Sequence, residues 1–269
     1  MRDYISVSQI NLYMMCSLKY RFSYIDEIEP RFKPAALAFG SSFHAALEWL
    51  HRRRMDHAPK ISEEEVARIF KADWYAWKFQ NVRFKDGQDH NTLTETGQRM
   101  ILKYMENLPE KKPLDVEVEF RVPLVNPETD EVLDMDLKGV IDLLESDDTI
   151  VEHKTSARVM DESTVNASLQ LTAYSYAFRY LFDRIEPGIR LDNITKSKQT
   201  RIVSFKVKRT ESDYVRLFNV ANSVLQGICA GIFFPTPNWM CADCEYLQEC
   251  IEWKGNSGMR QFHVKEVAA

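Results

Sequence analysis

The sequence predicts an α/β fold with a helical flank, and a change in hydrophobic periodicity is the main reason. Up to about residue 112, apolar residues recur every three to four positions, as they do in amphipathic helices. After Pro113 they alternate with polar residues, which is typical of strands with one buried face. Helical and strand patterns follow one another from there on, without internal repeats or a long linker. Residues 1–269 are therefore expected to form one domain.

Four helices are expected before Pro113. Ser6 or Ser8 is a suitable N-cap for the first of them, and Ser62 with Glu65 forms a capping box for the third. The expected helices cover residues 8–22, about 36–54, a stretch beginning after 62, and about 92–107. The second helix has a continuous apolar stripe formed by Phe39, Phe43, Ala46, Leu47 and Leu50.

Strands dominate the next region. The first covers 116–124, and a turn at 126–130 with a short run at 132–137 leads into a hairpin over 139–154. The polar turn of this hairpin is expected at 146–148. The remaining elements are a helix over 162–182, a strand over 201–208, a helix over 212–230 and a tail of little periodicity at 235–253.

Composition narrows the class of protein. The net charge of −5 excludes a generally basic nucleic-acid coat, so a polyanion would have to be held by a local basic patch or through metal ions. No stretch approaches the roughly 18 apolar residues of a membrane span, and the first residues lack the apolar core of a signal peptide. The expected location is the cytosol. Five cysteines, an odd number, argue there against a disulfide framework.

The hairpin carries the clearest chemistry. Strand alternation places Glu152 and Lys154 on one face, and pairing of the two strands brings Asp142 beside them. Carboxylate oxygens suit Mg²⁺ or Mn²⁺, and a nearby lysine can orient or deprotonate water or stabilise charge on phosphate. An acid–x–lysine triplet is also common on solvated strand faces, where its ion pair does little. The surrounding residues have to decide between these readings.

Three further residues are candidates near this hairpin. His44 lies on the second helix after a turn of small residues, and neutral imidazole suits Mn²⁺ better than Mg²⁺. Gln170 and Tyr174 are four residues apart and share one helix face. Gln170 would position metal-bound water or substrate, and Tyr174 would contact phosphate or a base. Ordinary surface exposure of His44 and ordinary packing of the other two are the alternatives.

The C-terminal tail has the spacing of a metal site. Cys241, Cys244 and Cys250 place three thiolates within ten residues, which favours zinc or an iron–sulfur cluster. Cys16 could be the fourth ligand and would tie the first helix to the tail. Cys229 is expected to be a core residue of the last helix.

Basic residues form two clusters. Arg52, Arg53 and Arg54 follow one another in the second helix. The second cluster has no acidic residue between its members, which are Lys196, Lys198, Arg201, Lys206, Lys208 and Arg209. Each could be a solvated face, but together they could form the phosphate-binding patch that the net charge does not provide.

The order of these motifs resembles the RecB-like branch of the PD-(D/E)XK nuclease superfamily. The resemblance extends from about residue 6 to 250 and is closest to iron–sulfur members, such as CRISPR-adaptation nucleases and AddB-type nuclease domains. The motifs in question are Cys16, Gly40-x3-His44, Asp142, Glu152-x-Lys154, Gln170-x3-Tyr174 and Cys241-x2-Cys244-x5-Cys250. The resemblance implies a restriction-endonuclease-like core, a mixed sheet flanked by helices. Its parts would be a helical region at 1–112, a catalytic region at 113–210 and a cluster segment at 211–269.

The resemblance also implies roles. His44, Asp142, Glu152 and the His153 backbone carbonyl would bind the catalytic Mg²⁺ or Mn²⁺. Lys154, Gln170 and Tyr174 match the catalytic positions that follow. Glu117 or Glu119 would match an additional acid of some relatives, and the implied ligands of a structural 4Fe–4S cluster are Cys16, Cys241, Cys244 and Cys250. Two departures are Ser17, where relatives often have proline, and glutamate rather than aspartate at 152.

The implied function is metal-dependent hydrolysis of DNA phosphodiester bonds, with exonuclease or end-processing activity. Two alternatives are a nuclease fold that only binds DNA or protein and an iron–sulfur redox protein. The chain has no GxxxxGK motif, so any ATP-driven unwinding would come from a partner helicase. CRISPR-adaptation or recombination proteins are the other expected partners.

Overall fold

The structure is a computed structural model that describes residues 3–56 and 60–255. The chain divides into two compact units, each described here by itself. The sheet unit comprises residues 32–122 and 139–210. The terminal unit comprises residues up to 31, residues 123–138 and residues from 211 onward. All residues of the expected divalent-metal site belong to the sheet unit, and the four expected cluster cysteines belong to the terminal unit.

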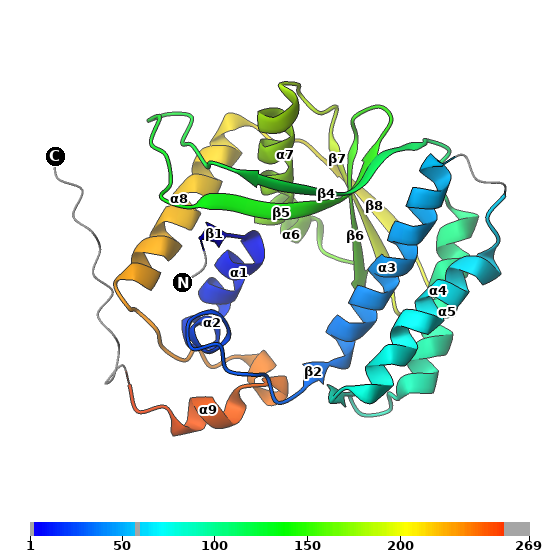
Figure 1. Ribbon diagram of the computed structural model, residues 1–269, viewed down its shortest axis with the longest axis horizontal. Helices are drawn as coiled ribbons and strands as arrows, with labels where there is room; N and C mark the ends of the chain where they lie inside the picture. The colour runs from blue at the N-terminus through cyan, green and yellow to red at the C-terminus, as the bar shows by residue number, and fades with distance from the viewer. Residues whose placement is uncertain (1–2, 57–59, 256–269) are drawn as a thin grey trace. The chain divides into compact units, whose positions relative to one another are not determined.

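A mixed β-sheet forms the centre of the sheet unit, with strand order β4–β5–β6–β7–β8 (Figure 1). Its strands are β4 (Pro113–Val122), β5 (Asp136–Glu145), β6 (Ile150–Ser156), β7 (Ile189–Thr195) and β8 (Ile202–Val207). β5 and β6 are antiparallel, β6 and β7 parallel, and β7 and β8 antiparallel. The predicted mixed α/β architecture is confirmed.

β7 is absent from the sequence-based prediction. Six of its seven residues are buried, including Asp192, Asn193 and Thr195, so the strand has no alternation of apolar and polar residues. Its parallel pairing with β6 extends from Ile150–Ile189 to Ser156–Thr195. β7 therefore covers the whole length of the strand that carries Glu152 and Lys154.

Helices complete the sheet unit, together with a two-stranded parallel pair formed by β2 (Lys33–Pro34) and β3 (Val82–Arg83). The helical elements are α3 (Ala35–Met55), α4 (Glu63–Ala76), η1 (Trp77–Phe79), α5 (His90–Glu106), α6 (Glu162–Asn166) and α7 (Leu169–Phe182). α3, α4 and α5 lie side by side (Figure 1) and share a core that contains Phe39, Phe43, Phe70 and Trp74, all fully buried. The predicted stripe of α3 is confirmed residue by residue.

Local signals explain where these helices begin. The capping box of Ser62 and Glu65 is formed, and Asp89 caps α5 by accepting from the Thr92 backbone N–H at 2.7 Å. The single helix expected over 162–182 is wrong, because the chain leaves helical geometry after Asn166. Ser168 then caps α7 by accepting from the Leu171 N–H.

The terminal unit contains β1 (Tyr4–Ile5), which pairs in parallel with the start of β5. Its helical elements are α1 (Val7–Met15), α2 (Ser17–Tyr24), α8 (Glu211–Cys229), η2 (Trp239–Asp243) and α9 (Leu247–Glu252). Ser6 caps α1 as expected. The single helix expected over 8–22 is wrong, because Cys16 adopts an extended conformation between α1 and α2. Leu18 N–H donates to the Phe234 carbonyl at 3.1 Å, and Phe234 N–H donates to Ser17 Oγ at 2.9 Å.

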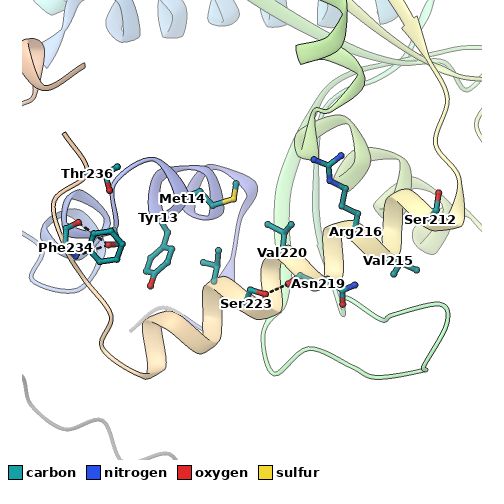
Figure 2. A pocket seen from close by; sticks show the side chains of 12 residues that line it. Tyr13, Met14, Ser212, Val215, Arg216, Asn219, Val220, Ser223, Phe234 and Thr236 are labelled. Atoms are coloured by element: carbon teal, nitrogen blue, oxygen red, sulfur yellow. Dashed lines mark hydrogen bonds between the residues drawn. The ribbon is translucent and has the colours of Figure 1, made fainter. Parts of the chain in front are cut away.

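A groove of about 660 Å³ lies between α1, α8 and the segment that follows α8 (Figure 2). Tyr13, Met14, Val220 and Phe234 are among the residues that line it, and none of the predicted site residues is. Cys229 is exposed, so its expected place in the core is wrong. The inward face of the last turn of α8 is instead formed by buried Leu225 and Ile228. None of the helices in the described part of the chain combines the length and hydropathy needed to cross a bilayer.

Candidate metal centre and cysteine cavity

Asp142 lies where β5 and β6 separate. The two strands pair at Leu143–Val151 and Leu144–Ile150. The next inward N–H of β6, that of His153, donates to Asp142 Oδ2 at 2.8 Å instead of to a backbone carbonyl. The carboxylate therefore holds the strands together at the point of separation, which places it beside Glu152 as the alternation predicted.

His44, Glu117 and Asp142 form a compact group of metal-ligating side chains. One ligand atom from each lies within 4.8 Å of the other two, and His44 Nδ1 is 3.5 Å from Asp142 Oδ2. They come from α3, β4 and β5. Of the two acids considered on β4, Glu117 is in the group and Glu119 is exposed. Glu117 has a φ of 54°, a left-handed conformation that interrupts the alternation of β4 and separates the directions of the two side chains.

Glu152 is buried beside this group, with 1 % of its side chain exposed. Lys154 Nζ lies 2.5 Å from Glu152 Oε1, so the predicted face holds an ion pair. Among the described residues, neither carboxylate oxygen of Glu152 has a partner with good hydrogen-bond geometry. Glu117, Asp142 and Glu152 together outnumber the one lysine beside them, which indicates that a further positive group belongs at the site.

Gln170 and Tyr174 lie on one face of α7, as expected. Gln170 Nε2 donates to Tyr174 Oη at 2.7 Å, and Tyr174 is 4 % exposed. The hydroxyl of Tyr174 interacts with Glu152, and burial and that carboxylate raise the pKa of Tyr174 well above its usual value. Tyr174 is thus a neutral hydroxyl beside Glu152, and Gln170 orients it.

The three carboxylates differ in their affinity for protons. Burial and the charge of Asp142 raise the pKa of Glu152 to about 7, and the same two causes raise the pKa of Glu117 to about 7. Burial also acts to raise the pKa of Asp142, but hydrogen bonding by His153 and the charge of His44 outweigh it, so that pKa is lowered. The site holds one firmly ionised carboxylate and two that bind protons near neutral pH.

This donor set fits a divalent cation. Carboxylate oxygens with one imidazole suit Mg²⁺ and, more closely, Mn²⁺. Burial lowers the pKa of His44, which favours the neutral imidazole that a metal ligand requires. A cation would also satisfy the oxygens of Glu152 and reduce the repulsion that raises two carboxylate pKa values.

Three side chains near this site were missed from the sequence, those of His51, Tyr104 and His153. For His153, only the backbone carbonyl was predicted from the sequence. Its side chain is 2 % exposed, and its Nε2 lies 2.9 Å from Tyr104 Oη. Tyr104 Oη is in turn 2.8 Å from Nε2 of His51. One signal was available, because His51 follows His44 by seven residues and so lies two turns along the same face of α3. Tyr104 on α5 gave no signal.

The four cysteines predicted to bind a cluster, three in the tail and Cys16, line one cavity in the terminal unit. The cavity has a volume of about 70 Å³, and Cys16, Cys241, Cys244 and Cys250 all border it together with Leu18, Phe22 and Tyr246. Burial and then the other three thiols raise the pKa of Cys250, so the sulfurs are electrostatic neighbours. Lys19 also lines the cavity, and its Nζ donates to Glu245 Oε2 at 2.7 Å.

The spacing of the sulfurs is wider than that of the carboxylate group. Within the described ranges, His44, Glu117 and Asp142 are the one set of three such ligand atoms within 4.8 Å of one another. No three cysteine sulfurs meet that limit. Cys16 has an extended backbone between α1 and α2, and its side chain borders the same cavity as the tail cysteines.

Some of the predicted basic residues are exposed, and others are packed against or hydrogen-bonded to the protein. Lys198 and Arg201 before β8, Lys206 on β8 and Lys208 directly after it are exposed. Lys196 is half-buried over the Phe39 ring, at 4.7 Å from its centroid, and burial lowers its pKa to about 8.

Arg209 does not fit the phosphate-binding expectation. It is 5 % exposed, and its guanidinium donates to Thr172 Oγ1 at 2.9 Å inside the sheet unit. Arg52 pairs with Glu48 at 2.9 Å, and Arg54 donates to the carbonyls of Pro109 and Lys111. Of the six residues in the second basic cluster, four therefore remain as an exposed cationic stretch.

The fold agrees with comparisons to known proteins. The sequence matches the PD-(D/E)XK nuclease superfamily over residues 4–251, and the chain belongs to this superfamily. The structure named "Putative exonuclease" from Eubacterium rectale covers 91 % of this chain and 88 % of its own, with a TM-score of 0.57 and 14 % identity. At that identity the likeness concerns the fold alone.

A second solved structure, that of SSO0001, covers 90 % of this chain and 94 % of its own at 17 % identity, but its TM-score is 0.35 and supports no argument. None of the curated proteins matches the sequence.

Proposed function

We propose that this protein is a divalent-metal-dependent deoxyribonuclease with a structural 4Fe–4S cluster. One observation carries the nuclease proposal: the group of His44, Glu117 and Asp142 lies beside a buried Glu152 that is paired with Lys154. Membership of a nuclease superfamily supports the same reading. The expected activity is exonucleolytic or end-processing hydrolysis of DNA.

The chain's own residues have distinct tasks in this proposal. His44, Glu117, Asp142, Glu152 and the His153 carbonyl would hold Mg²⁺ or Mn²⁺. A bound cation supplies a Lewis acid that reduces the charge on a phosphodiester and acidifies water.

Lys154 acts as a positive charge. Burial would lower its pKa, but the neighbouring Glu152 carboxylate raises it, so the amine stays an ammonium. Its Nζ is half-exposed and fixed by the ion pair, which suits it to neutralise the charge that builds on the scissile phosphate. Gln170 donates to Tyr174 and holds its neutral hydroxyl beside Glu152.

The cluster proposal rests on the cavity bordered by four cysteines. A zinc ion with sulfur ligands at about 2.3 Å requires sulfur atoms about 3.8 Å apart. Zinc is the alternative to an iron–sulfur group at these four cysteines. Such a group would join the α1–α2 break to the tail. Its role would be structural.

The exposed cations on β8 and next to it would contact the DNA backbone. We expect Lys198, Arg201, Lys206 and Lys208 to contribute additively and to make binding weaken with salt. A helicase, or CRISPR-adaptation or recombination proteins, would be the partners that deliver DNA, with the cytosol as the place of action.

The test uses full-length protein purified without air, so that cluster loss cannot imitate inactivity. End-labelled single- and double-stranded DNA is incubated with Mg²⁺ or Mn²⁺. The variants are Lys154→Ala and, as a matched control, Lys103→Ala, which removes an exposed lysine paired with Glu106 on α5. We expect cleavage that needs metal, disappears in Lys154→Ala and persists in Lys103→Ala.

The product ladder separates exonuclease from endonuclease. Absence of cleavage by folded, cluster-containing protein, tested with both metals, would contradict the proposal and favour a DNA- or protein-binding module. Iron and sulfide analysis of the same preparation tests the cluster separately, since zinc in their place would refute that part alone.

A further inference from the structure

A continuous line of buried polar side chains runs beneath the metal-ligand group. His51 from α3, Tyr104 from α5 and His153 from β6 are each at most 2 % exposed. Tyr104 Oη lies 2.8 Å from His51 Nε2 and 2.9 Å from His153 Nε2, so both contacts are hydrogen bonds. All three residues belong to the sheet unit.

Each end of this line faces a charged group. At the first end, Arg54 Nη1 lies 3.4 Å from His51 Nδ1, and the guanidinium is anchored on the Pro109 and Lys111 carbonyls. At the other end, Asp142 Oδ2 lies 3.6 Å from His153 Nδ1. The line therefore extends from a fixed cation to a carboxylate of the proposed metal site.

The two hydrogen bonds of Tyr104 allow two directions. A tyrosine hydroxyl has one proton, so it donates to one imidazole and accepts from the other, provided that both imidazoles are neutral. For Tyr104 and His51 burial supports neutrality, because it raises the pKa of Tyr104 and lowers the pKa of His51 well below its usual value.

The ends select between these directions. If Tyr104 donated to His51, then His51 Nδ1–H would face the Arg54 donor, and the bare Nδ1 of His153 would face the Asp142 carboxylate. Both ends would then be repulsive. If Tyr104 donates to His153, the bare Nδ1 of His51 accepts from Arg54, and His153 Nδ1–H points at Asp142. Both ends become attractive, and every buried polar atom of the line has a partner of the right kind.

We infer that Arg54, His51, Tyr104 and His153 form a one-way hydrogen-bond chain, in which each member donates to the next, and that Tyr104 and His51 are positioning residues for Asp142. The backbone N–H of His153 donates to one oxygen of Asp142 at 2.8 Å, and Nδ1 of its ring lies 3.6 Å from the same oxygen. Tyr104 and His51 fix the tautomer and orientation of that ring. The positioning role rests on the proposed divalent-metal site, whereas the direction of the chain does not.

The first experiment reads the tautomers directly. Full-length protein labelled with ¹⁵N at histidine is examined by long-range ¹H–¹⁵N correlation near pH 7.5. We expect His153 with its proton on Nδ1 and His51 with its proton on Nε2. Opposite tautomers, or an imidazolium at either residue, would overturn the chain.

The second experiment measures Mn²⁺ affinity by electron paramagnetic resonance, which needs no nuclease activity. Removing a partner of a metal ligand typically weakens metal binding by 10- to 100-fold. Tyr104→Phe removes one oxygen atom and should weaken Mn²⁺ binding by about 10-fold. Tyr214→Phe, at a buried tyrosine of the terminal unit, is the matched control and should leave the affinity unchanged.

Two variants of His51 separate positioning from general packing. His51→Gln keeps a donor toward Tyr104 and should stay within about 3-fold of wild type, and His51→Leu should resemble Tyr104→Phe. Unchanged affinity in both Tyr104→Phe and His51→Leu, with normal binding by wild type, would overturn the positioning role. No Mn²⁺ binding by wild type would instead overturn the proposed metal site and with it the positioning role, and the tautomers would still decide the direction of the chain.

Discussion

Glu152→Gln should stabilise the metal-free protein at pH 8. Glu152 has a pKa of about 7 in the folded protein and about 4.5 when unfolded. Between these values the folded state holds a proton that the unfolded state has released. Stability from this group is therefore complete below about pH 4.5 and is lost as the pH rises through 7.

The shift sets the size of the effect. A difference of 2.5 pKa units between 4.5 and about 7 corresponds to about 3 kcal/mol lost at pH 8. Glutamine removes the buried charge and with it the ion pair with Lys154, whose favourable effect is already included in this raised pKa. The net gain is therefore about 3 kcal/mol. At about 2–4 °C per kcal/mol, the Tm should rise by about 6–12 °C.

Thermal melting followed by circular dichroism, with a chelator present, measures this difference. At pH 5 the folded wild type carries a protonated Glu152 and only a minor part of the loss has occurred, so the Tm difference should be less than half of that at pH 8. Adding Mn²⁺ at pH 8 should raise the Tm of the wild type and leave that of Glu152→Gln nearly unchanged.

Glu186 provides a matched control. It is also a buried carboxylate, but it accepts from Ser175 Oγ and twice from the Arg179 guanidinium. Glu186→Gln should therefore lower the Tm at pH 8, with the opposite sign. A Glu152→Gln variant that melts below wild type at pH 8, or by the same displacement at pH 5, would refute the reasoning.

Three further predictions concern activity, the cluster and packing. Lys154→Ala should reduce cleavage at least about 100-fold in a gel assay while its melting curve stays close to that of wild type; retained cleavage would exclude the role of Lys154. Cys244→Ala should lose bound iron and lower the Tm of the full chain, because a group bridging Cys16 and the tail closes a loop of more than two hundred residues, and an unchanged Tm would contradict this. Gly97→Ala should destabilise by about 1–3 kcal/mol in urea unfolding, since the new methyl would lie 2.1 Å from Phe70 Cζ, whereas Gly40→Ala meets only an ordinary contact at 3.8 Å and should be neutral or stabilising.

Several parts of the site follow from local rules. Alternation along β6 is enough to place Glu152 and Lys154 on one face, and a hairpin is enough to bring Asp142 beside them. Helical spacing likewise places Gln170 and Tyr174 together. These arrangements depend on neighbours within a few residues or on one short turn, and such neighbours are visible in a sequence.

Other parts depend on contacts distant in the sequence. The choice of Glu117 over Glu119 follows from a left-handed backbone at Glu117, and alternation alone gives both acids the same face. The separation of α1 from α2 at Cys16 is accompanied by hydrogen bonds between Ser17, Leu18 and Phe234, more than two hundred residues away. β7 carries no periodic signal because it is buried on both sides.

The sequence by itself determined the mixed α/β class, most helix starts and the acidic pair with its lysine. These features follow from hydrophobic periodicity and helix capping, which depend on residues close together in the sequence. The tertiary structure decided that Glu117 joins the metal ligands, that Arg209 is buried, and that Tyr104 links His51 to His153. Each of these depends on which elements pack together and on which buried polar groups then need a hydrogen-bond partner. No local sequence pattern encodes that.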